Sequence, residues 1–517
     1  MHFGFRYRLL PSGAHLRVMS QSKYDSWSKE DLIARLLELE GHSKRAPKMS
    51  LPVNDKKPFH FSAHPVRKIA VKFCYSGWEY NGLAFQDSPT PLPTVEEVLF
   101  KAFAKTKLID NEAGSEGCGW EKCGRTDRGV SAAGQVISLW VRSALVAGQI
   151  SQDPNKRIDG VSEQLDVSLD DSNITDRLES AMQVLGGPPA RSQTDGSLPS
   201  DLRRQELRYI SMLNRVLPPT IRVLAWSPVS PTFSARFNCQ HRHYKYFFTS
   251  HGLDISLMQQ AANLLIGEHD FRNLCKLDPA KQITNFNRRV LRADINRVPE
   301  AGNNNVFVFD LVGSAFLYHQ VRHIMAILFL VGTGVEKPSI ITSLMNVDAS
   351  VSADLEFVDR KPEYQMADAL PLMLWDCAYA ESDVQWETGV VESGSASDLY
   401  HQLHSIHQRS LIHTTLDAHF LSATTRYHPP PPQYFPFSET GLTTSTIPPK
   451  SNSKESPILS IPLGGGMYTR CAKYIPVLLR KRLDHVEVAN ERWRAGKGGR
   501  REERKKATFA AASDGEE

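Results

Sequence analysis

Long apolar runs are missing from this sequence. The longest one, from Ile324 to Val335, is interrupted by glycine and is shorter than the roughly 20 residues that a membrane-spanning helix needs. We therefore expect a protein that does not span a membrane. Hydrophobic residues make up 41% of the chain and charged residues 23%, which is typical of a globular protein with some disordered segments.

Cysteine is also scarce, with seven residues in a chain of 517. An odd number of scattered cysteines does not form a disulfide framework in a chain of this size, so we expect a reducing compartment. Cys118 and Cys123 lie close together in the sequence. No second pair of metal ligands accompanies them, and we therefore expect no zinc at this pair and no bound metal.

Two motifs that would indicate a cofactor or a metal are incomplete. The segment 332–337 has the letters GTGVEK, which lack the third glycine of a dinucleotide-binding fingerprint. His319 and His323 are four residues apart, as in zinc proteases, but Gln320 replaces the glutamate that such enzymes require. These differences exclude a metalloprotease and leave no nucleotide-binding loop, so no cofactor is expected.

The net charge is only +4, but the charge is unevenly distributed. The segment 492–506 holds eight Lys or Arg residues against two Glu residues. At the other end, no acidic residue precedes Asp25, whereas Arg6, Arg8 and Arg17 occur in the same stretch. We interpret that stretch as an unstructured leader, with an organelle transit peptide as the alternative.

Alternating and helical apolar patterns predict a mixture of strands and helices. Strands are predicted at 69–74, 134–141, 221–226, 242–248, 305–313 and 371–379. Helices are predicted at 27–40, from 94 onward, at 255–266, at 315–330 and around the histidines 401–413, and the helix at 255–266 is expected to end at 267–271. Because Asp, Ser, Gly and Pro accumulate between 142 and 204, we expect a flexible insertion there.

One short loop contains a candidate catalytic residue. In the letters KCGRTDRGVSA, Asp127 lies between Arg125 and Arg128, and Gly124 and Gly129 allow a tight turn. An aspartate among cations is expected to be ionised at neutral pH, which suits a nucleophile better than a general acid. The alternative interpretation is an ordinary ion-pair turn on the surface.

The letters around Asp127 closely resemble the G-R-T-D-x-G-V core of the TruA family of tRNA pseudouridine synthases. Two further stretches resemble family motifs: FSARFN followed by RHYKYFF near residue 240, and AFLYHQVRH near residue 320. The resemblance covers roughly residues 67–385. Neither end of the chain nor the 142–204 region is included.

This resemblance implies an α+β fold, the pseudouridine synthase fold, in which two similar sheet-and-helix halves form one long mixed sheet with a central cleft. We accordingly expect an N-terminal extension over 1–66 and the N-terminal half over 67–250. The C-terminal half would follow over 251–385, and a C-terminal extension over 386–517.

The resemblance also assigns roles to individual residues. It implies that Asp127 is the catalytic aspartate, that Tyr244 lies in the active site, and that Arg322 forms an ion pair with Asp127. It places Leu372 against the target base, and we expect Arg125, Arg128 and Lys245 to contact RNA. Whether Asp127 attacks the sugar covalently or starts an elimination stays open at this point.

The implied activity is conversion of uridine to pseudouridine in the anticodon arm of tRNA. The C-terminal letters YIPVLLRKR resemble the branch that acts at positions 38 and 39. The alternatives are a sister branch that acts on other tRNA or mRNA uridines, and an inactive RNA-binding or chaperone protein with the same fold. The expected partners are tRNA and a second copy of the chain. The expected location is the nucleus and cytoplasm, with a mitochondrial pool as an alternative.

Overall fold

The computed structural model describes residues 59–86, 88–145, 206–301, 305–348, 356–388, 395–428, 459–471 and 474–500. The predicted helix at 27–40 and nearly all of the predicted insertion at 142–204 lie outside these residues. No helix in the described part of the chain is both long and apolar enough to cross a membrane.

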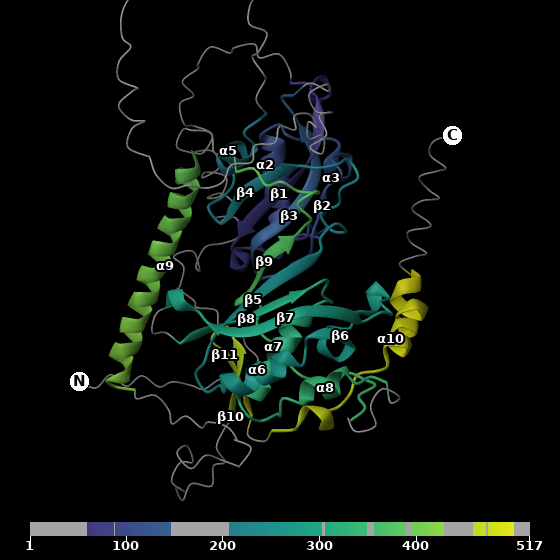
Figure 1. Ribbon diagram of the computed structural model, residues 1–517, viewed down its shortest axis with the longest axis vertical. Coiled ribbons are helices and arrows are strands. Elements are labelled where there is room, and N and C mark those ends of the chain that lie inside the picture. Colours follow the sequence, from purple (N-terminus) through teal and green to yellow (C-terminus); the bar gives the residue numbers. More distant parts are fainter. Residues whose placement is uncertain are drawn as a thin grey trace, which may run out of the picture. The chain divides into compact units, whose positions relative to one another are not determined.

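A nine-stranded sheet organises the fold, and the α+β prediction is confirmed (Figure 1). Its strand order is β4-β1-β3-β9-β5-β8-β7-β6, with β2 attached to β3. Every pairing is antiparallel except that of β3 with β9, which joins only Ser131 to Met373 and Ala132 to Leu374. The strands are β1 (Val66–Tyr75), β2 (Glu121–Lys122), β3 (Ser131–Arg142), β4 (Ile221–Pro228), β5 (His241–Thr249), β6 (Gly267–Asp270), β7 (Asn287–Arg297), β8 (Val306–Gly313) and β9 (Leu372–Ala378).

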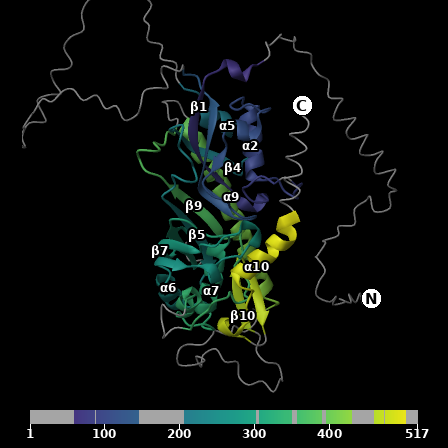
Figure 2. The same cartoon turned by 90° about the vertical axis from the view of Figure 1, so that its right-hand side faces the viewer.

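Strand β9 is the junction between two groups of strands, and both views place it between β1 and β7 (Figures 1 and 2). On one side it meets β3, and on the other it forms a longer ladder with β5. Strand β5 falls within the predicted N-terminal half, residues 67–250, and is hydrogen-bonded to β9 and β8. The sheet therefore depends on one strand from late in the chain to connect its two groups.

Each group of strands has its own hydrophobic core, and β9 contributes to both. Leu372 belongs to the core around β5, β7 and β8, whereas Leu374 belongs to the core around β1, β3 and β4. The first core contains helices α6 (Ile255–Asn263), α7 (Gln320–Gly332) and α8 (Ile340–Met345), and the second contains α2 (Val95–Lys105) and α5 (Tyr209–Asn214). Burial of these apolar faces provides most of the driving force for folding.

Most predicted elements are present, with three differences. Thr94 caps α2 as predicted, because its hydroxyl accepts a hydrogen bond from the Glu97 amide at 3.2 Å. Residues 267–270 form the edge strand β6 instead of a helix end, and β7 was not predicted. Helix α7 begins at Gln320, five residues later than predicted, because His319 adopts a left-handed conformation with φ of 59°.

The described C-terminal residues form further elements outside the large sheet. Helix α9 (Ser395–Thr425) has 31 residues, and strands β10 (Leu459–Gly464) and β11 (Met467–Cys471) form a separate two-stranded sheet. Helix α10 (Val486–Trp493) contacts the body through Asn490, whose side chain donates to the Ile283 carbonyl at 3.4 Å.

In the N-terminal part of the sheet, a short helix, α3 (Gly114–Gly117), precedes β2.

One buried polar group lies within the largely apolar helix α7. His323 is 6% exposed and its ring nitrogens lie 3.2 and 3.3 Å from the Lys361 ammonium, which also donates to the Cys275 carbonyl. Burial, assisted by the charge of Lys361, lowers the pKa of His323 to about 2. His323 is therefore neutral in the folded protein and acts as an acceptor for Lys361.

This arrangement predicts a pH-dependent stability. Below about pH 6.5 His323 is protonated in the unfolded chain but not in the folded chain. The contribution of this group to the free energy of unfolding should therefore fall by about 1.4 kcal/mol for each unit by which the pH is lowered. Urea unfolding at pH 5.5 and pH 7 should show a smaller loss for His323→Gln than for the unchanged protein. His407→Gln, on the exposed helix α9, is the control and should behave like the unchanged protein. Equal losses for the two variants would contradict the assignment.

Candidate active site

The loop that carries Asp127 is held tightly by the strands and loops around it. The Thr126 hydroxyl shares a buried 2.6 Å hydrogen bond with the Tyr75 hydroxyl at the end of β1. Gly129 has φ of +87°, a conformation that favours glycine, as the loop prediction required. At Gly77 a side chain would collide with the Val130 carbonyl, which would lie 2.1 Å from its Cβ. The loop backbone is thus fixed by hydrogen bonds and close packing before any substrate binds.

Val130 fixes the same loop to the other half of the sheet. It directly follows the turn in which its amide donates to the Asp127 carbonyl at 3.1 Å. Its side chain is 2% exposed and belongs to the core around β5, β7 and β8, although its own strand group has a different core. Burying this side chain across the junction stabilises the position of Asp127 relative to the C-terminal elements.

The polar partners of Asp127 are His319, which directly precedes helix α7, and Arg322 in its first turn, not the sequence neighbours of Asp127. Oδ2 of Asp127 lies 3.1 Å from Nε2 of His319 and 3.5 Å from Nη1 of Arg322. The expected contact with Arg322 is thus present. Arg125 and Arg128 are exposed, and no ion pair joins them to Asp127 in the described residues, which corrects the interpretation of this loop as a local ion-pair turn.

Arg322 is positioned by backbone as well as by charge. Its Nε donates to the Ala367 carbonyl at 2.8 Å, and the Ala367 amide donates back to the Arg322 carbonyl at 3.1 Å. The Arg322 side chain is only 11% exposed. A largely buried guanidinium that donates to a backbone carbonyl presents its remaining donors to Asp127 in a fixed direction.

His319 is the residue at this site that sequence reasoning missed. Its side chain is 7% exposed, and its second ring nitrogen, Nδ1, has no hydrogen-bond partner among the described residues. A ring with its hydrogen on Nε2 donates to Asp127 and leaves no buried N–H unsatisfied. The sequence had suggested only a histidine pair with His323, but that residue faces Lys361 instead.

Tyr244 joins this group from β5. Its ring meets the Phe316 ring edge to face, with the centroids 5.1 Å apart. Burial raises the pKa of Tyr244 strongly, and the nearby charges of Cys377 and Asp127 add to this rise while Arg242 opposes it. Tyr244 is therefore a neutral phenol, and it is near enough to Asp127 for the charge of the carboxylate to affect its pKa.

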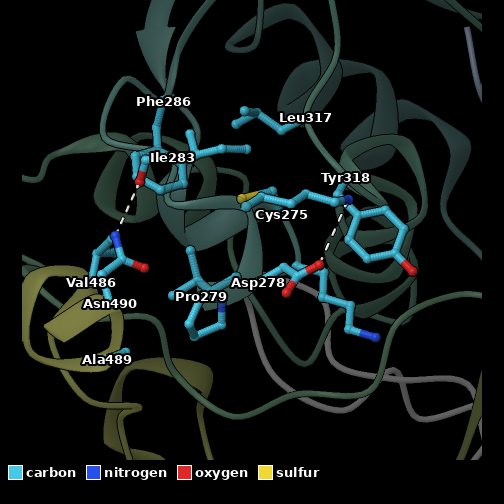
Figure 3. Close-up of a pocket in the computed structure, with 13 residues that line it drawn as sticks. Cys275, Asp278, Pro279, Ile283, Phe286, Leu317, Tyr318, Val486, Ala489 and Asn490 are labelled. Atoms are coloured by element: carbon cyan, nitrogen blue, oxygen red, sulfur yellow. Dashed lines mark hydrogen bonds and ion pairs between the residues drawn. The ribbon is translucent and has the colours of Figure 1, made fainter. Parts of the chain in front are cut away.

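A hollow with cations at its edge adjoins the site at Tyr318 (Figure 3). The centre of the Tyr318 ring lies 3.9 Å from that of the His319 ring, with the two rings tilted relative to each other. The Lys281 ammonium lies 3.6 Å and the Lys276 ammonium 5.2 Å from the centre of the Tyr318 ring. Burial lowers the pKa of Lys281, and the charges of Arg125 and Lys276 lower it further, whereas Asp278 and Asp127 raise it. Cations and an aromatic ring thus gather beside Asp127.

Two further predicted residues lie on opposite faces of the sheet. Lys245 alternates with Tyr244 along β5 and so points to the opposite face of the sheet, where its ammonium lies 3.6 Å from Asp310 and 4.5 Å from the centre of the Trp375 ring. Leu372 pairs with Tyr246 across β9 and β5, is 5% exposed and lies in the core. The structure does not bring Lys245 into the group around Asp127.

Among the described residues, one set of side chains has the spacing to hold a metal. The sulfur atoms of Cys123, Cys239 and Cys377 lie within 4.8 Å of one another. Cys118, the partner considered from the sequence, is not part of this set. The Asp127 group contains no such set.

The motifs, the fold and the geometry agree with comparisons to known proteins. A family model described as tRNA pseudouridine synthase matches residues 261–380. The tRNA pseudouridine(38/39) synthase of Bos taurus is 39% identical over 389 residues, covering 71% of this chain and 69% of the relative. The synthase of the same name from Saccharomyces cerevisiae is 39% identical over 395 residues, covering 72% and 75%. The match to the Homo sapiens protein of that name is 38% identical. The chain therefore belongs to the tRNA pseudouridine synthases of the TruA family, as its motifs predicted.

Proposed function

We propose that this protein converts uridine to pseudouridine in the anticodon arm of tRNA, at positions 38 and 39. The observation that carries the proposal is the carboxylate of Asp127, held against His319 and Arg322. The relatives named tRNA pseudouridine(38/39) synthase support the choice of substrate and positions.

The reaction needs only groups that this site contains. The bond between N1 of uracil and C1′ of its ribose breaks, the base turns, and a bond between C5 and C1′ forms. The hydrogen on C5 leaves as a proton and N1 gains one, so no oxidant and no group donor is consumed. Asp127 either attacks C1′ or removes a sugar proton, and both routes need an ionised carboxylate.

The neighbours of Asp127 divide the remaining tasks. Arg322 and His319 donate to the same carboxylate oxygen and so direct the other oxygen toward the substrate. Tyr244, with its raised pKa, stays a neutral phenol, which suits contact with the base better than proton removal by a phenolate. Leu372 is buried on the same sheet face as Tyr244, and its side chain would pack against the target base.

Access to C1′ requires the nucleotide to leave its stack, which costs a few kcal/mol. The aromatic ring of Tyr318 with the ammonium groups of Lys276 and Lys281 offers stacking and phosphate contacts that offset this cost. The exposed Arg125 and Arg128 on the loop itself would add backbone contacts or fill the space that the nucleotide leaves.

The central prediction concerns the carboxylate. Asp127→Asn keeps the shape of the side chain but removes its charge, so it should lower the rate of pseudouridine formation by at least about 10²-fold and leave tRNA binding unchanged. Tritium release from tRNA labelled at C5 of uridine measures the first quantity, and filter binding measures the second. Asp294→Asn, which changes a half-buried carboxylate of β7 paired with Arg292, is the matched control. Activity of Asp127→Asn at the control level would remove the basis of the mechanism.

Mapping of the modified positions, together with the tritium-release assay, decides between the alternatives. Mapping pseudouridine in tRNA from a deletion strain should show uridine at positions 38 and 39, and restoring the unchanged chain should restore both. Modification of other tRNA or mRNA uridines would assign the protein to the sister branch. A purified protein that binds tRNA without releasing tritium would be an RNA-binding protein without this activity.

A second prediction tests the role of His319. His319→Ala removes a hydrogen bond to an ionised group, so kcat should fall about 10- to 100-fold while tRNA affinity stays constant. His319→Gln can still donate an N–H to Asp127 and should recover part of the rate. If both variants lose activity equally together with thermal stability, His319 has only a structural role.

The proposal includes a homodimer, and helix α9 offers a surface for it. Along this helix of about 46 Å, nearly every described side chain is exposed, including Ile412, Leu416 and Phe420, which are four residues apart and follow one face. Large apolar side chains in such a row favour association with a second copy.

Charge on this face should disrupt the dimer. Light scattering of the double variant Ile412→Glu with Leu416→Glu should give half the mass of the unchanged protein, because each glutamate would have to be desolvated at the interface. Thr414→Glu lies on the opposite side of the same helix and should leave the mass unchanged. A monomeric unchanged protein at micromolar concentration, or a double variant that stays dimeric, would rule out this surface.

A further inference from the structure

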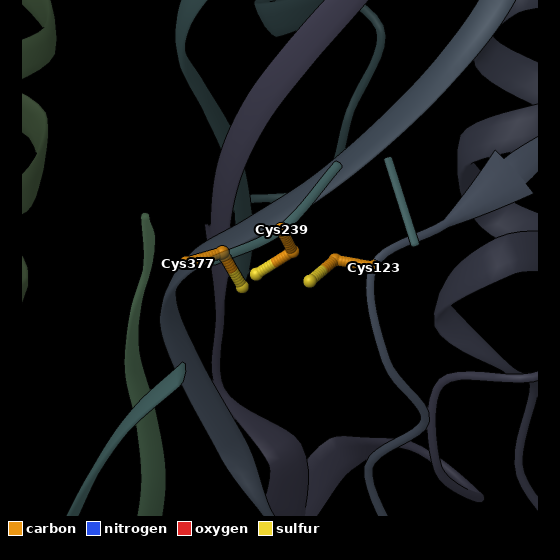
Figure 4. Close-up of side chains that lie close together, drawn as sticks. All are labelled: Cys123, Cys239 and Cys377. Carbon is orange, nitrogen blue, oxygen red and sulfur yellow. The ribbon is translucent and has the colours of Figure 1, made fainter. Parts of the chain in front are cut away.

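Three cysteines from distant parts of the sequence meet at the junction of the two halves (Figure 4). Cys123 follows β2 and precedes the Asp127 loop, Cys239 lies just before β5, and Cys377 lies in β9. Their exposed fractions are 2%, 8% and 2%. Their sulfur atoms lie within 4.8 Å of one another, and in Figure 4 all three point toward one shared space.

The Arg242 guanidinium lies beside Cys123. Arg242 is fixed there, since its Nη2 donates to the Cys123 carbonyl at 3.1 Å and its Nη1 to the Ser314 carbonyl at 2.8 Å. Thiolates in a buried, positively charged site are good metal ligands.

We propose that Cys123, Cys239 and Cys377 together bind one soft metal ion, Zn²⁺ or Cu⁺, that ties the Asp127 loop to the junction strand β9. Zinc–thiolate bonds of about 2.3 Å correspond to sulfur–sulfur distances of about 3.8 Å. The sulfurs therefore need to approach one another by about 1 Å or less. The ion displaces the thiol protons to solvent and takes their place between the three sulfurs.

The ligand set selects the class of metal. Thiolates select Zn²⁺ and Cu⁺, whereas Mg²⁺ and Ca²⁺ prefer oxygen ligands. No histidine or carboxylate joins the three sulfurs in the described part of the chain. The charges of three thiolates are balanced by Zn²⁺ together with the Arg242 guanidinium. Coordination by three sulfurs also suits Cu⁺. Experiment therefore decides between the two ions.

The proposed ion would join the Asp127 loop to strand β9 at a junction where few backbone hydrogen bonds connect the two groups of strands. Strands β3 and β9 share only two register pairs, so few hydrogen bonds connect the N-terminal strands to the rest of the sheet. Cys123 is four residues before Asp127, and Cys377 lies on the strand that contributes to both cores. A metal at this point fixes the position of the loop relative to the second half.

Metal content of the full chain tests this proposal without depending on enzymatic activity. The protein is isolated without chelator and is then dialysed under anaerobic conditions against Zn²⁺ alone or against Cu⁺ alone. It should retain about one ion per chain in one of these two dialysis experiments. Cys377→Ser should reduce that occupancy at least about 10-fold. The control Cys275→Ser, which changes a buried thiol in the other core, should retain full occupancy.

A second measurement keeps the test valid if Cys377→Ser does not fold. The unchanged protein exchanged into Co²⁺ should show an intense thiolate-to-cobalt charge-transfer absorption, and Cys239→Ser should weaken it. The proposal is overturned if neither Zn²⁺ nor Cu⁺ is retained above the level of the variants, or if two of the three cysteines are found as a disulfide in the native protein.

Discussion

The site depends on one contact between residues 195 positions apart in the sequence, the ion pair of Asp127 with Arg322. A carboxylate loses much of its hydration when it is enclosed, and only nearby donors make up for that loss. Here the donors are His319 and Arg322, both from the start of α7. The two halves of the sheet must therefore dock correctly before the carboxylate is stable in its place.

Strand β9 makes that docking specific. It presents Leu372 to one core and Leu374 to the other, and a shift of one residue in its register would turn each of them to the opposite face. Val130 adds a second connection, because it leaves the Asp127 loop and enters the C-terminal core. Thus the position of the Asp127 loop relative to the C-terminal core is set by packing across the junction. The three thiols proposed as a metal site lie at this same junction.

The distribution of charge matters more than its sum. A net charge of +4 in 517 residues predicts little about an RNA partner. The structure gathers Arg125, Lys276 and Lys281 near Tyr318, at the edge of the Asp127 group. Cations beside an aromatic ring are suited to a polyanion with bases that can stack. Lys245, although equally basic, lies on the other face with Asp310 and Trp375.

The sequence by itself determined the family, the Asp127 loop, most of the strands and the expectation that Arg322 meets Asp127, because these follow from local letters and alternating patterns. It did not reveal β7, the left-handed turn at His319 or the side of the sheet on which Lys245 lies. Only the tertiary structure decided that His319 completes the carboxylate site. It also decided that the thiol of Cys123 lies near those of Cys239 and Cys377, and not near that of Cys118. The physical reason is that such contacts are set by how two separately packed cores meet at β9, and no short stretch of sequence contains that information.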